Sequence, residues 1–207
     1  MRSARESHWR LDATDVARAA VFTGCIAALG LPGAFTAFGG VPITAQTLGV
    51  MLAGAVLGPR LGALSVTLLL ALVAVGMPLL AGGRGGVAVF VSPTGGYDLG
   101  WVLGAFVIGA IVHAGGRKPV WWRTVLGTVV GGIVVIYAVG IPVQSAVTHL
   151  PLAPTVLASL VFVPGDLLKA AIATFVVHTL ARSYPRAFRQ HRWSGAVRAP
   201  EPIETQR

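Results

Sequence analysis

Residues 164–182 read PGDLLKAAIATFVVHTLAR, and this stretch largely decides the fold class. A helix over these 19 residues would extend about 28 Å at about 1.5 Å per residue, which is close to the roughly 30 Å hydrocarbon thickness of a bilayer. Pro164 suits the first helical turn, where its missing N–H costs little. The only charges well inside the stretch are Asp166 and Lys169. The stretch therefore predicts a membrane-crossing helix that carries a pair of charges.

The composition of the whole chain agrees with this interpretation. Of 207 residues, 55% are hydrophobic and only 11% are charged, whereas soluble domains carry about 25% charged residues. The mean hydropathy is +0.77. So short a chain cannot hide that much apolar surface in one aqueous core, and disorder requires the opposite composition. The composition thus largely excludes a soluble protein and predicts a polytopic membrane protein.

The apolar segments predict an all-α fold with six transmembrane helices. A tail of residues 1–15 precedes a membrane domain of residues 16–182, and a basic tail of residues 183–207 follows it. The expected helices cover residues 16–31, 46–57, 61–79, 98–114, 120–140 and 164–182. The intervening segments 34–45 and 80–97 are rich in Gly and Pro and are expected to be loops. Residues 141–163 are expected to form a loop and a short apolar piece.

The basic residues predict the orientation of this bundle. Six crossings place both termini on one side, and every Lys and Arg except Arg84 and Lys169 falls in the tails, loops or helix ends of that side. Because positively charged loops stay in the cytoplasm, both termini are expected to be cytoplasmic in a multi-pass plasma-membrane protein. The net charge of +9 then indicates orientation in the bilayer, and no nucleic-acid partner is expected.

The two charges inside the last helix are the first candidate site. Asp166 and Lys169 are spaced i, i+3, so they share one helix face. Ionisable groups within membrane spans are costly and usually face a cavity or a partner. Two compatible interpretations remain: an ion pair that only stabilises the helix, or a polar patch in a pocket that opens to the outside.

A glycine-rich segment, residues 82–96, is the second candidate site. Such a segment turns tightly and brings backbone N–H groups close to a ligand. It leads into the N-terminus of the next helix, where the helix dipole favours an anion such as a carboxylate, and Arg84 adds a cation. The alternative is a re-entrant hairpin with no ligand. The candidate residues are Gly83, Arg84, Gly85, Gly86, Thr94, Gly95 and Gly96.

Other features indicate contacts between helices rather than chemistry. Ala20, Gly24 and Ala28 recur every four residues, a small-residue stripe that lets another helix approach closely, within this chain or from a partner. Cys25 is the only cysteine, which excludes an intrachain disulfide.

No catalytic or metal-binding arrangement is evident in the sequence. The histidines lack ligand-like spacing, and no catalytic dyad or nucleotide-binding motif occurs, so an enzyme is not expected. Transport driven by ATP would need another subunit.

Several separated motifs resemble one known family. They are VPITAQTLGVMLAG (41–54), LGPR (57–60), AGGRGG (81–86), PTGGY (93–97) and FVPGDLLKA (162–170). In this order they are similar to the signature stretches of the BioY family, the biotin-specific S components of energy-coupling-factor transporters. The resemblance covers about residues 16–182. Asp98 departs from it, because an apolar residue is expected there, and Ser92 stands where Gly is usual.

The resemblance implies a six-helix S-component fold that binds biotin from outside and releases it inside. It implies a transmembrane coupling (T) subunit and two ATPase subunits as partners, and no cofactor. Asp166 would accept ureido N–H bonds, and Lys169 would donate to the ureido carbonyl or keep Asp166 ionised. Tyr97 would pack on the ligand, and Gln46 and Tyr137 are further polar contacts. Which end of biotin meets which group stays open.

Three other functions remain as alternatives to biotin binding. The chain could be an S component for another vitamin, a small intramembrane enzyme, or a structural membrane subunit with no ligand.

Overall fold

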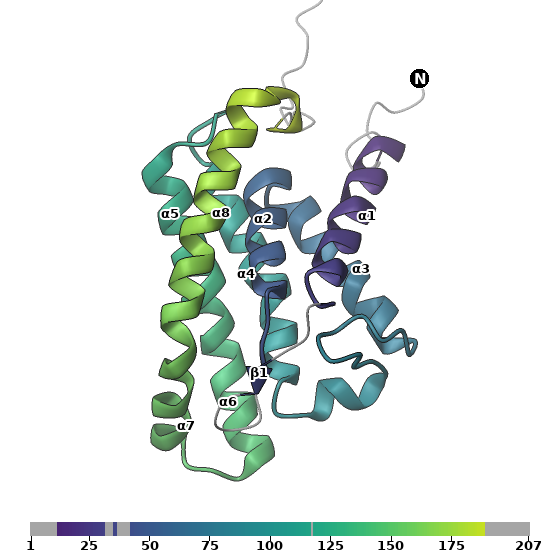
Figure 1. Ribbon diagram of the computed structural model, residues 1–207, viewed down its shortest axis with the longest axis vertical. Coiled ribbons are helices and arrows are strands. Elements are labelled where there is room, and N and C mark those ends of the chain that lie inside the picture. Colours follow the sequence, from purple (N-terminus) through teal and green to yellow (C-terminus); the bar gives the residue numbers. More distant parts are fainter. Residues whose placement is uncertain (1–11, 32–34, 37–41, 117, 189–207) are drawn as a thin grey trace, which may run out of the picture.

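The apolar segments form helices in the computed structural model, which describes residues 12–31, 35–36, 42–116 and 118–188 (Figure 1). The α-helices are α1 (Ala13–Ala28), α2 (Gln46–Leu57), α3 (Pro59–Ala74), α4 (Gly95–His113), α5 (Trp121–Val129), α6 (Ile136–Thr148), α7 (Leu152–Ser159) and α8 (Val163–Ser183). The 3₁₀ segments are η1 (Val87–Val91), η3 (Leu160–Phe162) and η4 (Pro185–Phe188), and a π-helix, η2 (Val130–Val135), joins α5 to α6. Strands β1 (Phe35–Thr36) and β2 (Pro42–Ile43) form a small antiparallel pair. The predicted helical fold class is confirmed.

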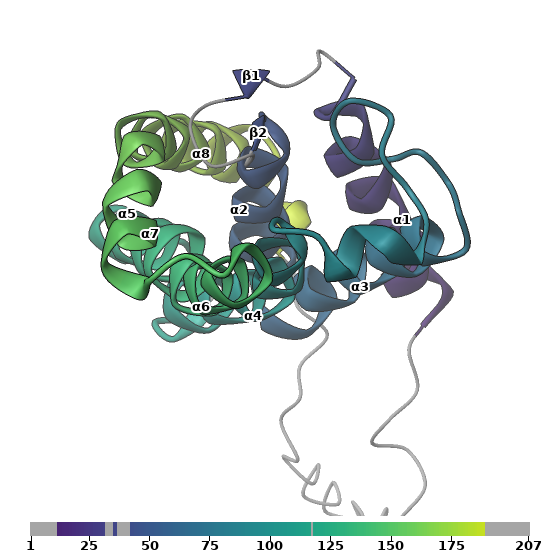
Figure 2. The same ribbon diagram turned by 90° about the horizontal axis from the view of Figure 1, so that it is seen from below.

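Two helices, α2 and α4, form the centre of the bundle. α2 packs against α1, α3, α4 and α8, and α4 packs against α2, α3, α5 and α6. Figure 2 shows α2 between α8 on one side and α1 on the other. Glycine allows this packing, because a Cβ atom on Gly54 would lie 2.5 Å from the carbonyl oxygen of Ala105 in α4. A Cβ atom on Gly62 of α3 would in turn lie 2.8 Å from Gly54 Cα.

A side chain at Gly54 should therefore destabilise the bundle. We expect Gly54→Val to cost about 1–3 kcal/mol, because overpacking forces helices apart, and to lower the apparent Tm in detergent. The matched control is Gly24→Val on α1, where an added Cβ atom would meet no atom within 4 Å. Equal Tm values for the two variants would show that the close contact of α2 with α4 does not limit stability.

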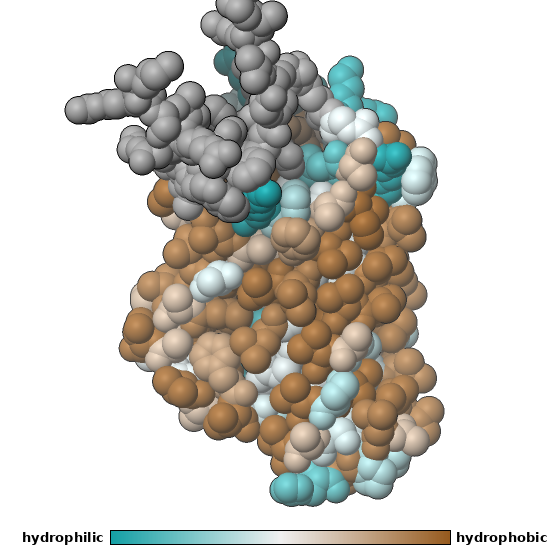
Figure 3. Space-filling view, turned by 180° about the vertical axis from the view of Figure 1, so that it is seen from behind, coloured by the Kyte–Doolittle hydropathy of each residue, from teal (hydrophilic) through white to brown (hydrophobic). Residues whose placement is uncertain are grey.

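The surface of the bundle is that of a membrane protein. Within the described part of the chain, three helical segments, residues 95–113, 121–148 and 152–183, are long and apolar enough to cross a bilayer, and α2 and α3 are shorter apolar helices. Figure 3 shows a broad hydrophobic surface with hydrophilic residues gathered toward its two ends. Leu168 and Phe175 on α8 are 63% and 66% exposed. A continuous apolar surface of this kind fits lipid contact rather than water.

The boundaries of several predicted segments differ from the structure. The loop and short apolar piece expected over residues 141–163 are mostly helical, because α6 continues through Pro142 to Thr148 and helical segments follow from Leu152 onward. Membrane helices tolerate proline, since neighbouring groups satisfy the freed backbone. The helix expected over 61–79 ends earlier, at Ala74, before a turn in which Gly76 adopts φ +103°. The prediction of 46–57 matches α2.

Candidate substrate-binding site

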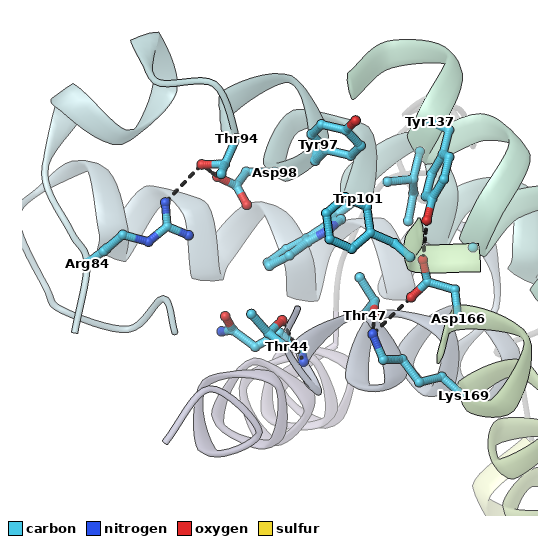
Figure 4. Close-up of a pocket in the computed structure, with 14 residues that line it drawn as sticks. Thr44, Thr47, Arg84, Thr94, Tyr97, Asp98, Trp101, Tyr137, Asp166 and Lys169 are labelled. Carbon is cyan, nitrogen blue, oxygen red and sulfur yellow. Dashed lines mark hydrogen bonds and ion pairs between the residues drawn. The ribbon is translucent and has the colours of Figure 1, made fainter. Parts of the chain in front are cut away.

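A pocket lies where α2, α4, α6 and α8 meet the loop before α4 (Figure 4). Counting its open mouth, it contains about 600 Å³ of space. Its lining residues are Thr44, Gln46, Thr47, Arg84, Thr94, Tyr97, Asp98, Trp101, Gly132, Ile136, Tyr137, Phe162, Asp166 and Lys169. Figure 4 shows charged residues on both sides of Trp101, with Arg84 and Asp98 on one side and Asp166 and Lys169 on the other.

The α8 side of the pocket is built around an ion pair. Lys169 Nζ lies 2.9 Å from Asp166 Oδ1 and donates a second hydrogen bond to Thr47 Oγ1 at 3.0 Å. The Tyr137 hydroxyl donates to Asp166 Oδ2 at 2.6 Å. Asp166 also stands in the first turn of α8, where the helix dipole favours a negative charge. This end of the pocket therefore presents an ordered acceptor, Asp166, beside an ordered donor, Lys169.

Aromatic rings form the middle of the pocket. Tyr97 and Trp101 are buried on α4, and Phe162 is buried just before α8. The Tyr97 ring meets the Tyr137 ring edge to face, with centroids 5.9 Å apart and planes at 82°. Because the Tyr97 hydroxyl donates to Gln144 Oε1 at 2.8 Å, the ring is held in place from behind. The middle of the pocket thus suits a flat or ring-shaped apolar ligand.

The loop side of the pocket carries a second pair of charges, bridged by a threonine. Arg84 Nη1 donates to Thr94 Oγ1 at 2.9 Å, and Thr94 Oγ1 donates to Asp98 Oδ2 at 3.3 Å. The Asp98 side chain comes from the first turn of α4 and is only 2% exposed. This end of the pocket therefore also combines a donor, Arg84, with an acceptor, Asp98.

Gln46 lies in the pocket wall, but backbone groups use its amide. Its Nε2 donates to the carbonyl oxygens of Ile26, at 3.3 Å, and Leu79, at 3.0 Å. Its Oε1 accepts the Ala81 N–H at 2.9 Å. One buried side chain thus ties the end of α1 and the loop that carries Arg84 to the start of α2.

A π-helical turn shapes the pocket wall next to α2. η2 contains Gly131 and Gly132, and Gly132 lines the pocket. A Cβ atom on Gly132 would lie 2.5 Å from Met51 Cε of α2. Turns of this kind are rare and often occur at functional sites. Here the turn directly precedes Ile136 and Tyr137, so it sets how both face the pocket.

The comparisons with known proteins agree with this geometry. A family model described as the BioY family matches residues 2–186. The chain belongs to the BioY family. The biotin transporter BioY of Rhizobium etli is 45% identical over 179 residues, which cover 83% of this chain and 95% of the relative. The biotin transporter BioY of Rhodobacter capsulatus is 45% identical over 178 residues, which cover 81% of this chain and 93% of the relative.

A solved structure supports the fold of this BioY-family chain. The crystal structure of the S-component for biotin from an ECF-type ABC transporter matches it with a TM-score of 0.78 at 33% identity. The match covers 87% of this chain and 100% of that chain. The bundle therefore has the S-component fold.

The structure brings seven of the predicted contact residues of the BioY-family chain together in one pocket. These residues are Gln46, Arg84, Thr94, Tyr97, Tyr137, Asp166 and Lys169. They come from α2, the loop before α4, α4 itself, α6 and α8, which are far apart in the sequence. Their contact with a ligand stays a prediction.

The five predicted glycines have a different place in the structure. Gly83, Gly85, Gly86, Gly95 and Gly96 are not among the described residues that line the pocket. Gly83 and Gly86 adopt φ of +70° and +85°, a backbone conformation that favours glycine. A Cβ atom would press against the Met77 carbonyl at position 85, the Phe90 carbonyl at position 95 and the Val143 side chain at position 96. Gly83, Gly85 and Gly86 therefore shape the loop that carries Arg84, whereas Gly95 and Gly96 let the start of α4 pack closely against its neighbours.

Several lining residues were not predicted from the sequence. They are Thr44, Thr47, Asp98, Trp101, Gly132, Ile136 and Phe162. Asp98 could have been predicted as a lining residue, because it is acidic at a position where the family motif leads one to expect an apolar residue. Thr44 and Thr47 lie inside the motif of residues 41–54, and their spacing around Gln46 puts them at the start of a helix. No feature of the sequence distinguishes Trp101, Ile136 and Phe162 from their many apolar neighbours.

The small-residue stripe of α1 lies on the outside of the described bundle. Ala20, Gly24 and Ala28 are all exposed. Gly24 and Ala28 also line a second hollow, between α1 and the loop that contains Leu79 and Gly83. The stripe is therefore free for a partner helix, and a contact there stays a prediction.

Proposed function

We propose that this BioY-family chain is the substrate-binding membrane subunit of a biotin uptake system. It captures biotin from outside the cell and releases it inside with an ATP-driven energy-coupling module. The observation that carries the proposal is the pocket with Asp166 and Lys169 beside aromatic walls. The ureido ring of biotin has N–H donors for Asp166 and a carbonyl acceptor for Lys169, and the apolar ring fused to it suits the aromatic lining of Trp101 and Phe162.

The relatives decide between transport and catalysis. They are transporters, and the matched crystal structure is a transporter S-component. The expectation that the chain is not an enzyme is confirmed by these comparisons.

The proposal includes six membrane crossings with both termini in the cytoplasm of the cell. It is supported by the long helices over 95–113, 121–148 and 152–183 and by the position of the basic residues along the chain. Arg84 lines the pocket, and it is the one basic residue that the predicted topology assigns to the outer loops. The pocket would therefore open near the outer face of the membrane.

The partners in this proposal are a transmembrane coupling subunit and two ATPase subunits. The exposed Ala20, Gly24 and Ala28 on α1 support it, since small residues let a partner helix approach the backbone closely. ATP hydrolysis is assigned to the partners, because the sequence carries no nucleotide-binding motif.

Calorimetry on the full chain in detergent tests the ligand. We expect biotin to bind in the nanomolar range without ATP, and thiamine and riboflavin not to bind. Binding of another vitamin in place of biotin would favour an S component of different specificity. Absence of any binding would overturn the proposed function.

A further inference from the structure

The Tyr97 hydroxyl joins three helices behind the pocket. It comes from α4, donates to Gln144 Oε1 of α6 at 2.8 Å and lies 3.0 Å from Ser159 Oγ at the end of α7. Figure 4 shows this hydroxyl turned away from the pocket residues Trp101 and Asp166. Gln144 and Ser159 are 2% and 1% exposed, and neither is among the described residues that line the pocket. They therefore hold Tyr97 from outside the space that a ligand would fill.

One face of α6 fits around the Tyr97 ring. Tyr137, Gly140 and Gln144 are spaced i, i+3 and i+7, so they follow one another along this face. A Cβ atom on Gly140 would press against the Tyr97 ring. The Tyr97 and Tyr137 rings meet edge to face, an arrangement that aromatic pairs prefer. A shift of the Tyr97 ring would therefore move Tyr137 as well.

Tyr137 connects this pair of rings to the charged end of the pocket. Its hydroxyl donates to Asp166 Oδ2 at 2.6 Å, while Asp166 Oδ1 accepts from Lys169 Nζ at 2.9 Å. Lys169 lies on the same helix as Asp166, whereas the Tyr137 hydroxyl reaches the carboxylate from α6. The direction in which the Asp166 carboxylate faces the pocket therefore depends on where the two tyrosine rings lie.

We propose that Gln144 and Ser159 are positioning residues for ligand recognition by Asp166, and that they act through Tyr97 and Tyr137. The inference rests on the proposed function, in which Asp166 accepts the ureido N–H groups of biotin. Without the hydrogen bonds behind it, the Tyr97 ring can move and take Tyr137 with it. Asp166 then meets the ureido group at a poorer angle, and hydrogen bonds weaken as their geometry departs from linear.

Titration calorimetry on the full chain in detergent, with biotin as the probe, tests the proposal. Gln144→Met keeps the length of the side chain and removes the acceptor of the Tyr97 hydroxyl. We expect it to raise the Kd for biotin about fivefold, the equivalent of one neutral hydrogen bond. Ser159→Ala should act in the same direction. Thr128→Val, which loses a buried hydroxyl that bonds within α5, is the matched control and should leave the Kd unchanged.

Two double variants separate positioning from a general loss of stability. In a Tyr97→Phe background, which keeps the ring and lacks the hydroxyl, Gln144→Met should raise the Kd by less than about twofold. The same reduction is expected in an Asp166→Asn background, because the effect reaches the ligand through that carboxylate. A merely structural loss would be equally large in all three backgrounds, since independent effects add.

The outcomes separate this inference from the proposed function. Tight binding of biotin by the wild type, with an unchanged Kd in Gln144→Met, would overturn the inference and leave the proposed function standing. A loss that persists undiminished in either background would overturn the inference as well. Failure of the wild type to bind biotin would overturn the proposed function, and the inference with it. If Gln144→Met is not monodisperse, Ser159→Ala takes its place against the same two backgrounds.

Discussion

Replacing Asp166 by asparagine should raise the Kd for biotin roughly 10- to 150-fold, the equivalent of about 1.5–3 kcal/mol for a hydrogen bond to a charged group. Asp166 accepts from both Lys169 Nζ and the Tyr137 hydroxyl, and the proposed ligand adds ureido N–H groups to the same carboxylate. Asparagine keeps the size and one acceptor but removes the charge, and it leaves Lys169 without its ion pair. Titration calorimetry on the purified chain measures the change.

Lys169→Met and the double variant show whether the pair acts as one unit. If it does, the Lys169→Met loss should be similar, and the double variant should lose much less than the sum of the two. Asp12→Asn, outside the pocket, is the control for losing a carboxylate. An Asp166→Asn variant with unchanged affinity would remove Asp166 from the ligand contacts.

Replacing Gln46 by leucine should loosen the loop of residues 77–86 and lower stability. The change leaves the Ala81 N–H and the carbonyl oxygens of Ile26 and Leu79 without their present partner. Each buried polar group left unpaired costs about 1–3 kcal/mol. Because the loop can shift and give some of the three groups new partners, the total loss of stability should be about 2–4 kcal/mol. We expect a lower apparent Tm in detergent and faster amide hydrogen exchange across residues 77–86.

The exchange pattern makes this prediction specific. Exchange within α4 should stay slow, because the hydrogen bonds of the Gln46 side chain go to Ile26, Leu79 and Ala81 and none of these residues lies in α4. Thr67→Val is a matched loss of polarity, since the Thr67 hydroxyl is exposed and bonds only within its own helix, to Ala63. If exchange across residues 77–86 is as slow in Gln46→Leu as in Thr67→Val, Gln46 does not anchor the loop.

The helices could be predicted from the sequence where a break in the chain is unambiguous. Gly58 and Pro59 separate α2 from α3, and φ of +84° at Gly58 fits its role. The helix predicted to end at residue 140 continues to Thr148 with Pro142 inside it, and α4 and α7 pack against this helix, α6. Sequence reasoning has no access to these neighbours, and they decide whether a helix continues.

The site could be predicted only where its residues differ in kind from their surroundings. Asp166 and Lys169 are conspicuous as charges within an apolar helix, and the structure pairs them. Trp101 and Phe162 are apolar residues among apolar residues, and helices that are hydrophobic all round show no periodic face. The glycine-rich motif predicts Gly95 and Gly96 as ligand contacts, but glycine also allows close helix packing, and the sequence pattern alone does not separate these uses.

The π-helical turn η2 takes up one residue of the long segment from Trp121 to Thr148. A π turn holds one residue more than an α turn, and one residue corresponds to a rotation of about 100° around the helix axis. Because the extra residue is accommodated within Val130–Val135, α6 can direct Tyr137 toward Asp166 while α5 packs against α8. One residue added elsewhere in the segment would rotate Tyr137 by about 100° instead. The turn is therefore the place in this wall where the chain can change length by one residue without losing the contact of Tyr137 with Asp166.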